Sequence, residues 1–327
     1  MYIEDLKFSL WADFIEREYL ENEFKELIEK RVINGATSNP AIFKSAILSS
    51  AAYKEQLASL DEKLSAKEKY EAVAIFDIQK AADVLAPLYR AGDDGYVSIE
   101  VDPFLCDDAD ATVVEGKRLY KAIDRENVMI KVPATEAGYV AMEELTAAGI
   151  ALNATLVFKK EQALACMAAF ERGAQRAAKS VDTVISIFVS RVDRAIDSIL
   201  KEKGIATALT GIYNTSDIYE AIEARELPRC RALFASTGVK DDSLPPYYYV
   251  EQLLAYNTVN TAPVDTIKAF DKDAKKTKAL PIEREVITAH MQKVAQAGID
   301  LDALLEKQIA DGLEAFKDAF KEILEAL

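Results

Sequence analysis

The sequence predicts one α/β domain, residues 1–327, in which eight parallel strands close into a (β/α)8 barrel, also called a TIM barrel. Two observations lead to this prediction. Apolar runs of strand length recur along the chain, and an amphipathic segment with apolar residues at helical spacing separates each run from the next. Strict alternation of strand and helix implies parallel strands with crossover helices, and eight such units favour a closed barrel. The alternative is an open doubly wound sheet, but no Gly-x-Gly-x-x-Gly motif follows any of the runs.

The predicted strands are short runs rich in apolar and β-branched residues. In chain order they span residues 8–14, 32–38, 95–102, 127–133, 150–158, 183–190, 205–213 and 230–237. The amphipathic segments between them include residues 16–31, 68–90 and 160–180, where apolar residues repeat every three or four positions. The tail predicts one long helix, about 300–325, that begins at an Asp cap and packs over one end of the barrel, near its mouth.

The length and composition agree with a single large barrel. Barrels run longer than most single domains, and these 327 residues are 50% hydrophobic with only 12 Gly and 9 Pro, enough for a large core. The net charge of −15 repels phosphate backbones, so we expect no nucleic acid and no membrane as a partner. No apolar segment reaches transmembrane length, and the first residues lack the basic stretch of a signal peptide.

The rare residue types limit the chemistry. Cys106, Cys166 and Cys230 are odd in number, far apart and without metal-ligand spacing, as expected of buried thiols in a reducing cytoplasm. A chain whose only histidine is His290 has no His-rich zinc site, and a Ser or Cys triad would depend on that one residue. We therefore expect a cytoplasmic protein without a metal or cofactor, whose catalysis uses Lys, Asp, Glu and hydroxyl groups.

One lysine interrupts a run that otherwise predicts a buried strand. In residues 127–135, NVMIKVPAT, the three β-branched residues alternate with Met129 and Lys131, so the lysine points to the opposite face. Burying an ammonium group is unfavourable by several kcal/mol unless the group is paired or loses its proton. Lys131 is therefore either a strand-end residue that reaches solvent or a carboxylate, or a desolvated amine that attacks a carbonyl.

Polar residues on the other predicted strands share the side of Lys131. In a (β/α)8 barrel, active groups come from the C-terminal ends of the strands, whereas Val, Ile and Leu fill the rest of the interior. Near those ends stand Asp13, Ser98, Glu100, Asp102, Asn153, Thr155, Ser186, Arg191 and Ser236. A solvated edge strand would explain some of them, and buried amides or hydroxyls often only satisfy the backbone. Two carboxylates, one amine and several hydroxyls in one place are, however, the groups that a Schiff-base enzyme needs.

Six motifs, in this order and spacing, resemble the transaldolase family over nearly the whole chain. They are ATSNPAIF at 36–43, IKVPAT at 130–135, LNATLVF at 152–158, ISIFVSRVD at 185–193, ASTGVK at 235–240 and YYYVEQLLAYNTVNTAP at 247–263, the last of which resembles the segment after the final strand. The resemblance implies a (β/α)8 barrel that acts in the pentose phosphate pathway without a metal. A dihydroxyacetone unit would pass from sedoheptulose 7-phosphate to glyceraldehyde 3-phosphate, giving erythrose 4-phosphate and fructose 6-phosphate.

The resemblance also implies roles for single residues. Lys131 matches the family's Schiff-base lysine, and Asp13 matches the aspartate that takes the proton of the C4 hydroxyl as the C3–C4 bond breaks. Glu100 matches the glutamate that, with Thr155 and a water, moves protons as the carbinolamine dehydrates. The expected substrate-binding residues are Thr37, Asn39, Asn153, Ser186, Phe188, Arg191 and Ser236, the last two at the phosphate.

The chain departs from the family pattern at the phosphate. The better-known branch carries an arginine two residues after the serine that matches Ser236, and here that position is Gly238. The nearest cation is Lys240, which would hold a phosphate as a point charge rather than by a bidentate fork. Lys240 is therefore a further expected substrate-binding residue, in place of the missing arginine.

Two other functions compete with transaldolase activity. An aldolase of the fructose-6-phosphate aldolase type would share the barrel and the lysine, but that group is shorter, with glutamine at the position of Glu100 and tyrosine at that of Phe188. A catalytically silent barrel that serves as a scaffold would have no reason to keep an amine, two carboxylates and Arg191 together. We therefore expect sugar-phosphate substrates. The sequence leaves open whether the protein is a monomer or a homodimer.

Overall fold

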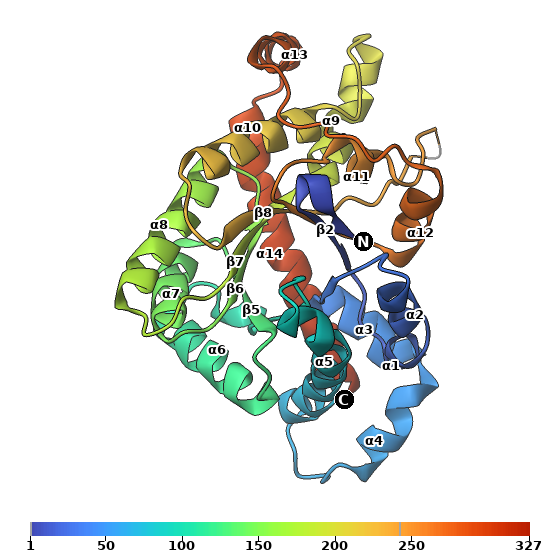
Figure 1. The fold of residues 1–327 in the computed structure, drawn as a ribbon, viewed down its shortest axis with the longest axis vertical. Coiled ribbons are helices and arrows are strands. Elements are labelled where there is room, and N and C mark those ends of the chain that lie inside the picture. Colours follow the sequence, from blue (N-terminus) through green and yellow to red (C-terminus); the bar gives the residue numbers. More distant parts are fainter. Residues whose placement is uncertain (1, 242) are drawn as a thin grey trace.

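Eight parallel strands close into a barrel in the computed structural model, which describes residues 2–241 and 243–327 (Figure 1). The barrel strands are β2 (Phe8–Ala12), β3 (Gly35–Thr37), β4 (Tyr96–Glu100), β5 (Val128–Pro133), β6 (Leu152–Val157), β7 (Thr183–Phe188), β8 (Cys230–Ala235) and β9 (Val259–Ala262). Each strand pairs in parallel with the next, and β2 pairs in parallel with β9, which closes the ring. The short strand β1 (Tyr2–Ile3) lies antiparallel to β2. The prediction of a (β/α)8 barrel is confirmed.

The predicted strand at residues 205–213 is wrong. Its second half begins helix α10 (Thr210–Ala224), and its first half has no strand pairing. The apolar residues that suggested a strand belong to a helical pattern, because Ile212, Tyr219 and Ile222 are buried at spacings of three and seven residues. This apolar stripe packs α10 against the barrel instead of adding a strand to it.

The eighth barrel strand is β9, in the segment that resembled the connection after the final strand. Its four residues include Asn260 and Thr261, both buried, so the strand lacks the apolar run that marks the other seven. The side-chain oxygen of Asn260 accepts a hydrogen bond from the Thr237 hydroxyl at 2.9 Å, which satisfies a polar group inside the barrel wall. Ser236 consequently follows the seventh barrel strand, β8, and not the eighth as the sequence suggested.

Helices cover the outside of the barrel (Figure 1). Besides α10 they are α1 (Arg17–Glu21), α2 (Glu23–Glu29), α3 (Pro40–Ser49), α4 (Lys54–Ser59), α5 (Ala66–Arg90), α6 (Ala109–Ile123), α7 (Glu136–Ala147), α8 (Lys160–Arg176), α9 (Ser190–Glu202), α11 (Tyr248–Gln252), α12 (Val264–Asp273) and α13 (Arg284–Gln296). The longest of these, α5, begins at a capping box in which Ser65 and Glu68 each accept a hydrogen bond from the other's backbone N–H. The main apolar core lies between these helices and the outward-facing strand residues such as Ile130 and Val132.

A tryptophan fills the lower part of the barrel interior. Trp11 on β2 is fully buried, and its indole Nε1–H donates to the Asp94 carboxylate at 2.9 Å. The neighbouring strand makes room for the ring with Gly35, where an added Cβ would lie 2.5 Å from the indole nitrogen. A larger residue at Gly35 would therefore displace the indole. Asp13 follows Trp11 by two residues, so its side chain lies on the same side of the chain as the indole, nearer the C-terminal end of the barrel.

The C-terminal helix α14 (Leu301–Ala326) crosses the barrel near its C-terminal mouth (Figure 1). It begins where the sequence predicts, since the Asp300 side chain accepts a hydrogen bond from the backbone N–H of Ala303 at 3.1 Å. A glycine permits close approach to the mouth, because a Cβ on Gly312 would lie 2.9 Å from Leu156 and 3.4 Å from the guanidinium of Arg191. The helix thus covers the side of the barrel where active groups are expected.

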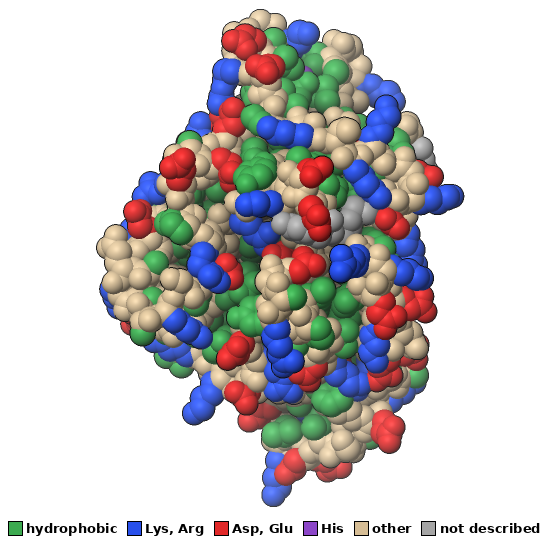
Figure 2. Space-filling view, in the orientation of Figure 1, with side chains coloured by type: hydrophobic (Ala, Val, Ile, Leu, Met, Phe, Trp, Pro, Cys, Tyr) green, Lys and Arg blue, Asp and Glu red, His purple; other side chains and the backbone are tan. Residues whose placement is uncertain are grey.

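The surface carries charges of both signs. On the face shown in Figure 2, Lys and Arg side chains are interspersed with Asp and Glu and do not gather in one basic patch. Within residues 2–241 and 243–327, no helix combines the length and the apolar character needed to cross a membrane.

Candidate active site

A cavity of about 210 Å³ lies at the C-terminal ends of the barrel strands, beside α14. Its lining consists of Asp13, Thr37, Asn39, Ala41, Lys131, Thr155, Ser186, Phe188, Arg191, Ala235, Ser236, Thr261, Ala315 and Phe316. The fold thus brings most of the predicted site residues to one place from strands that are far apart in the chain. Glu100 and Asn153 lie next to Lys131 in the barrel wall, since both are register partners of that residue, whereas Lys240 does not line the cavity.

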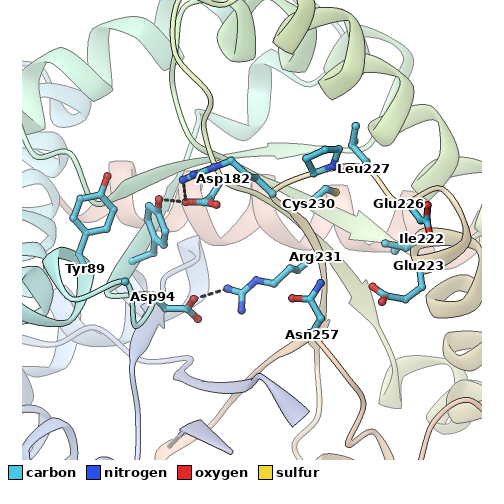
Figure 3. A pocket seen from close by; sticks show the side chains of 14 residues that line it. Tyr89, Asp94, Asp182, Ile222, Glu223, Glu226, Leu227, Cys230, Arg231 and Asn257 are labelled. Carbon is cyan, nitrogen blue, oxygen red and sulfur yellow. Dashed lines mark hydrogen bonds and ion pairs between the residues drawn. The ribbon is translucent and has the colours of Figure 1, made fainter. Parts of the chain in front are cut away.

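A larger cavity, about 820 Å³, lies at the opposite end of the barrel, where the strands begin (Figure 3). Two ion pairs lie in its wall: Arg231 with Asp94 at 2.6 Å and Arg229 with Asp182 at 2.7 Å. The Tyr96 hydroxyl also donates to Asp182, at 2.5 Å. The active groups of (β/α)8 barrels come from the other end, and none of the predicted site residues lies here. Size therefore does not identify the active site, and the smaller cavity is the candidate.

Lys131 and Glu100 form the buried centre of the site. They are register partners on β5 and β4, and their exposed fractions are only 5% and 8%. The Nζ atom of Lys131 donates to the Ser38 carbonyl at 3.0 Å and lies 3.7 Å from Oε2 of Glu100. Burial raises the pKa of Glu100 to about 7, an effect that the Lys131 charge opposes and the Asp13 charge reinforces. Near neutral pH, Glu100 can therefore both donate and accept a proton.

Asp13 follows β2 directly and faces the same cavity. Its backbone N–H donates to Ala262 of β9, and its carboxylate accepts from the Thr37 hydroxyl at 2.7 Å. The Thr37 oxygen is also 2.6 Å from the Thr261 hydroxyl, so Thr261 donates to Thr37 when Thr37 donates to Asp13. Burial raises the pKa of Asp13, whereas the Lys131 charge and the Thr37 hydrogen bond lower it. Three strands thus fix one carboxylate oxygen.

Thr155 sits at an irregular point of β6. The pairing of β6 with β7 shifts register between Ala154 and Val157, and Leu156 has a positive φ of 57°. Such bulges re-aim a side chain, and here Thr155 lines the cavity. Its hydroxyl is buried and, within the described part of the chain, has no hydrogen-bond partner. The hydroxyl is thus free to bind a substrate or a water.

Asn153 and Ser186 form a hydrogen-bonded pair beside the lysine. The Ser186 hydroxyl donates to the Asn153 side-chain oxygen at 2.6 Å, and the Asn153 amide donates to the Ser98 hydroxyl at 3.3 Å. Because its amide is held at both ends, Asn153 is fixed in orientation below the cavity. Asn39 is fixed in another way, as the N-cap of α3, where its side chain accepts from Ile42 N at 3.0 Å.

A cationic corner lies at the start of α9. Arg191 is half-buried there, with its guanidinium carbon 5.0 Å from the centroid of the Phe188 ring. Burial lowers the pKa of Arg191, which the nearby Arg194 charge also lowers, but an arginine stays protonated at any ordinary pH. Ser236, with a positive φ of 55°, brings its hydroxyl to within 3.2 Å of that of Ser190. An arginine, two hydroxyls and a helix N-terminus form a site suited to an anion.

Comparison with known proteins identifies the family. Residues 10–327 match the family model described as transaldolase/fructose-6-phosphate aldolase. The chain belongs to this family. It is 46% identical to a transaldolase of Campylobacter jejuni strain RM1221, with 98% of this chain and 99% of that protein covered. It is 43% identical to a transaldolase of Helicobacter pylori strain Shi470, with 97% and 98% covered.

One solved structure is a weak match. The crystal structure of a citrate lyase from Burkholderia xenovorans LB400 is 13% identical, with a TM-score of 0.31 and coverage of 73% of this chain and 92% of that chain. A similarity at this level does not establish a shared fold or a shared function. The assignment to the transaldolase/fructose-6-phosphate aldolase family rests on the family model and on the full-length relatives.

One expected site residue of this family member stands apart from the others. Lys240 is exposed, whereas the rest of the predicted set is buried or half-buried. A Cβ at Gly238, the position of the missing arginine, would approach the Pro263 ring to 3.2 Å. Among the described residues, Arg191 is therefore the basic side chain that lines the cavity besides Lys131, and the assignment of Lys240 to the phosphate remains a prediction.

Sequence reasoning missed three contributors to the site. Thr261 supports Asp13 through Thr37, and its parity in β9 would have shown it if that strand had been recognised. The Ser38 contact to Lys131 uses a backbone carbonyl, which no residue type reveals. Phe316 comes from α14, and an apolar residue of an amphipathic helix gives no sign that it faces a cavity.

Proposed function

We propose that this protein is a transaldolase that moves a dihydroxyacetone unit from sedoheptulose 7-phosphate to glyceraldehyde 3-phosphate through a Schiff base on Lys131. One observation carries the proposal: the Lys131 amine is buried 3.7 Å from Glu100 and lines the same cavity as Asp13. Imine formation followed by carbon–carbon cleavage requires an amine, a proton donor and a base close together. Membership of the family and the relatives named transaldolase support the same reaction.

Imine formation uses Lys131 and Glu100. The Lys131 nitrogen attacks the ketose carbonyl, and the resulting carbinolamine loses its hydroxyl as water after accepting a proton. Glu100 is the donor, because its pKa of about 7 keeps part of the population protonated at neutral pH. The free hydroxyl of Thr155 orients the water that leaves.

Bond cleavage uses Asp13. Its carboxylate takes the proton of the C4 hydroxyl, the C3–C4 bond breaks, and the electron pair moves into the enamine on Lys131. Asp13 then returns the proton to the new hydroxyl when the enamine adds to the acceptor aldehyde, so the cycle consumes no proton. Thr37 and Thr261 hold this carboxylate in place. The hydroxyls of the three-carbon unit bind to Asn39 and Ser186, which line the cavity, and to Asn153, which is hydrogen-bonded to Ser186.

The phosphate lies at Arg191 and Ser236. Both line the cavity, and Phe188 supports the guanidinium from below. The N-terminus of α9 adds the partial positive charge of its free backbone N–H groups. We extend the proposal to a cytoplasmic location, which the three free, buried cysteines support.

The matched family model also names fructose-6-phosphate aldolase, which is the second candidate. Incubation with fructose 6-phosphate and an acceptor aldehyde separates the two. Transfer of the three-carbon unit to the acceptor is the expected result, whereas release of free dihydroxyacetone would identify an aldolase. The absence of both products would mean that the barrel is not catalytic.

A further inference from the structure

A third cavity, much smaller than the other two, lies against Glu100 in the barrel wall. Its volume is about 10 Å³, roughly the space of one water molecule. Among its lining residues are Tyr70, Glu71, Glu100, Asp102 and Glu115. Both carboxylate oxygens of Glu100 are buried and accept no hydrogen bond from the residues that the structure describes. A buried carboxylate without a donor is unfavourable, so this cavity is a suitable place for a water that donates to Glu100.

The same cavity borders a group of ion pairs from α5, α6 and the end of β4. The Nζ atom of Lys67 is 2.6 Å from Asp102 and 3.1 Å from Glu115, and Arg118 is 2.6 Å from Glu71 and 2.7 Å from Glu115. We call these five residues the outer ion cluster. The three carboxylates are nearly buried, whereas the Lys67 and Arg118 side chains are 34% and 43% exposed. The cluster therefore extends from the small cavity to solvent.

Tyr70 lines the small cavity together with Glu100 and with the three carboxylates of the outer ion cluster. Its ring packs edge-on against Phe43 and Phe320, with centroids 5.9 and 5.1 Å away, which holds it in position. Burial raises the pKa of Tyr70, and the charges of Glu100, Glu71, Asp102 and Glu115 raise it further. The phenol consequently keeps its proton at neutral pH, and a neutral phenol beside carboxylates serves as a hydrogen-bond donor.

Glu100 needs a route for its proton that does not cross the substrate. In the proposed reaction it gives a proton to the departing hydroxyl of the carbinolamine and regains one when the imine is hydrolysed. While a sugar phosphate fills the substrate cavity, α14 and the ligand cover that side. Of the residues that line the small cavity, only Asn39 also lines the substrate cavity, and the small cavity borders the outer ion cluster, which reaches solvent.

We propose that Tyr70 and one water in the small cavity connect Glu100 to the outer ion cluster, and that this connection sets the protonation of Glu100 and exchanges its proton with solvent. The inference rests on the proposed function of Glu100. Tyr70 and Asp102 are then positioning residues, because they act through Glu100 and do not touch the substrate. The exchange consumes no net proton, since the proton lost at dehydration returns at hydrolysis.

The other charges that face Glu100 are Lys131, Asp13 and Arg191 on the substrate side. They stay unchanged in variants of the outer side. Removing the Tyr70 hydroxyl takes a donor from the ionised form of Glu100, which raises its pKa, whereas Asp102→Asn removes a nearby negative charge, which lowers it. The two variants therefore predict shifts of opposite direction, which a loss of structure alone would not give.

The test measures imine formation with fructose 6-phosphate as a function of pH, by borohydride trapping at early times. For Tyr70→Phe we expect the alkaline midpoint to move up by roughly 0.5–1 pH unit, and for Asp102→Asn to move down by a similar amount. KM should stay within about twofold of the wild-type value, because neither residue touches the substrate. The Phe ring keeps the packing of Tyr70, and Asn keeps the side-chain oxygen that accepts from Phe104 N at 2.9 Å.

The matched control is Tyr19→Phe. Tyr19 lies on α1, and its hydroxyl is also buried, but it does not line the small cavity. This variant should keep the wild-type midpoint, and an equal shift in this control would overturn the inference. If both test variants titrate like the wild type while the wild type traps an imine, the inference is wrong and the proposed function stands. If the wild type traps no imine at any pH, the proposed function is wrong, and the inference fails with it.

Discussion

The Nζ atom of Lys131 lies 3.7 Å from Oε2 of Glu100, on neighbouring strands and almost without contact to solvent. This separation is longer than a hydrogen bond, so neither group is locked to the other. The carboxyl group changes protonation near neutral pH, with a pKa of about 7. In the proposed mechanism, the amine that attacks the substrate and the carboxyl group that transfers the proton are thus adjacent, where the carbinolamine would form and dehydrate.

Covalent capture should occur at Lys131. Borohydride reduction in the presence of fructose 6-phosphate should add a dihydroxyacetone-derived mass to the peptide that contains Lys131. Lys131→Arg should abolish both the label and the activity, because a guanidinium stays protonated and does not attack a carbonyl. The exposed Lys121→Arg is the matched control and should react like the wild type. A label on any other lysine would contradict the mechanism.

Variants of the two carboxylates should be slow at different steps of the reaction. Removal of a general acid or base slows the step that it serves by about 10²–10⁴-fold. Asp13→Ala should form the imine with an intact sugar phosphate and cleave it slowly, so that reduction traps the whole sugar. Glu100→Gln should be slow to form any imine. Mass spectrometry distinguishes the two adducts, and an Asp13→Ala enzyme that traps only the three-carbon fragment at the normal rate would show that Asp13 is not the base.

Arg191→Ala should weaken the binding of phosphorylated substrates. Loss of a charge-assisted contact costs about 2 kcal/mol, which corresponds to a rise in KM of roughly 30-fold. Lys240→Ala should raise KM in the same way only if Lys240 replaces the missing arginine; unchanged kinetics would agree with its exposed position outside the cavity lining. Steady-state kinetics with fructose 6-phosphate measure both effects. A raised KM in Lys240→Ala would show that this side chain does reach the phosphate.

The titration of Glu100 should be visible in stability. Its pKa is raised from 4.5 to about 7. Between these two pH values, Glu100 is protonated in the folded state and ionised in the unfolded chain. The stability linked to this proton is fully present below about pH 4.5 and is lost as pH rises to about 7. Glu100→Gln removes the titration, and its stability relative to the wild type should therefore increase by roughly 2–3 kcal/mol between pH 4.5 and pH 8. Urea unfolding at these two pH values measures the change; an equal difference at both would mean that Glu100 ionises normally.

The sequence predicted the parts of the fold that depend on periodicity. Buried parallel strands give apolar runs, and seven of the barrel strands were found in this way. The pattern failed at β9, where Asn260 and Thr261 are buried as polar residues, and at 205–213, where the apolar stripe of α10 imitates a strand. Short apolar runs do not distinguish these cases without knowledge of the contacts.

The site was predictable where strand parity governs it. Parity placed Asp13, Glu100, Thr155 and Lys131 on one side of the barrel, and the structure has them together. Contacts between distant helices are a different matter. Lys67 looks like any charged residue of an amphipathic helix until α5 and α6 bring it next to Asp102 and Glu115.

The position of Trp11 also gives the protein an internal optical probe. It is the only tryptophan of the sequence and lies inside the barrel. It belongs to β2, the strand that Asp13 follows directly. Its fluorescence therefore arises from a single, buried environment. A red shift of that emission reports opening of the barrel itself. Fraying of the peripheral helices, which contain no tryptophan, leaves the emission unchanged. Barrel integrity can thus be followed in every variant described above without attaching a label.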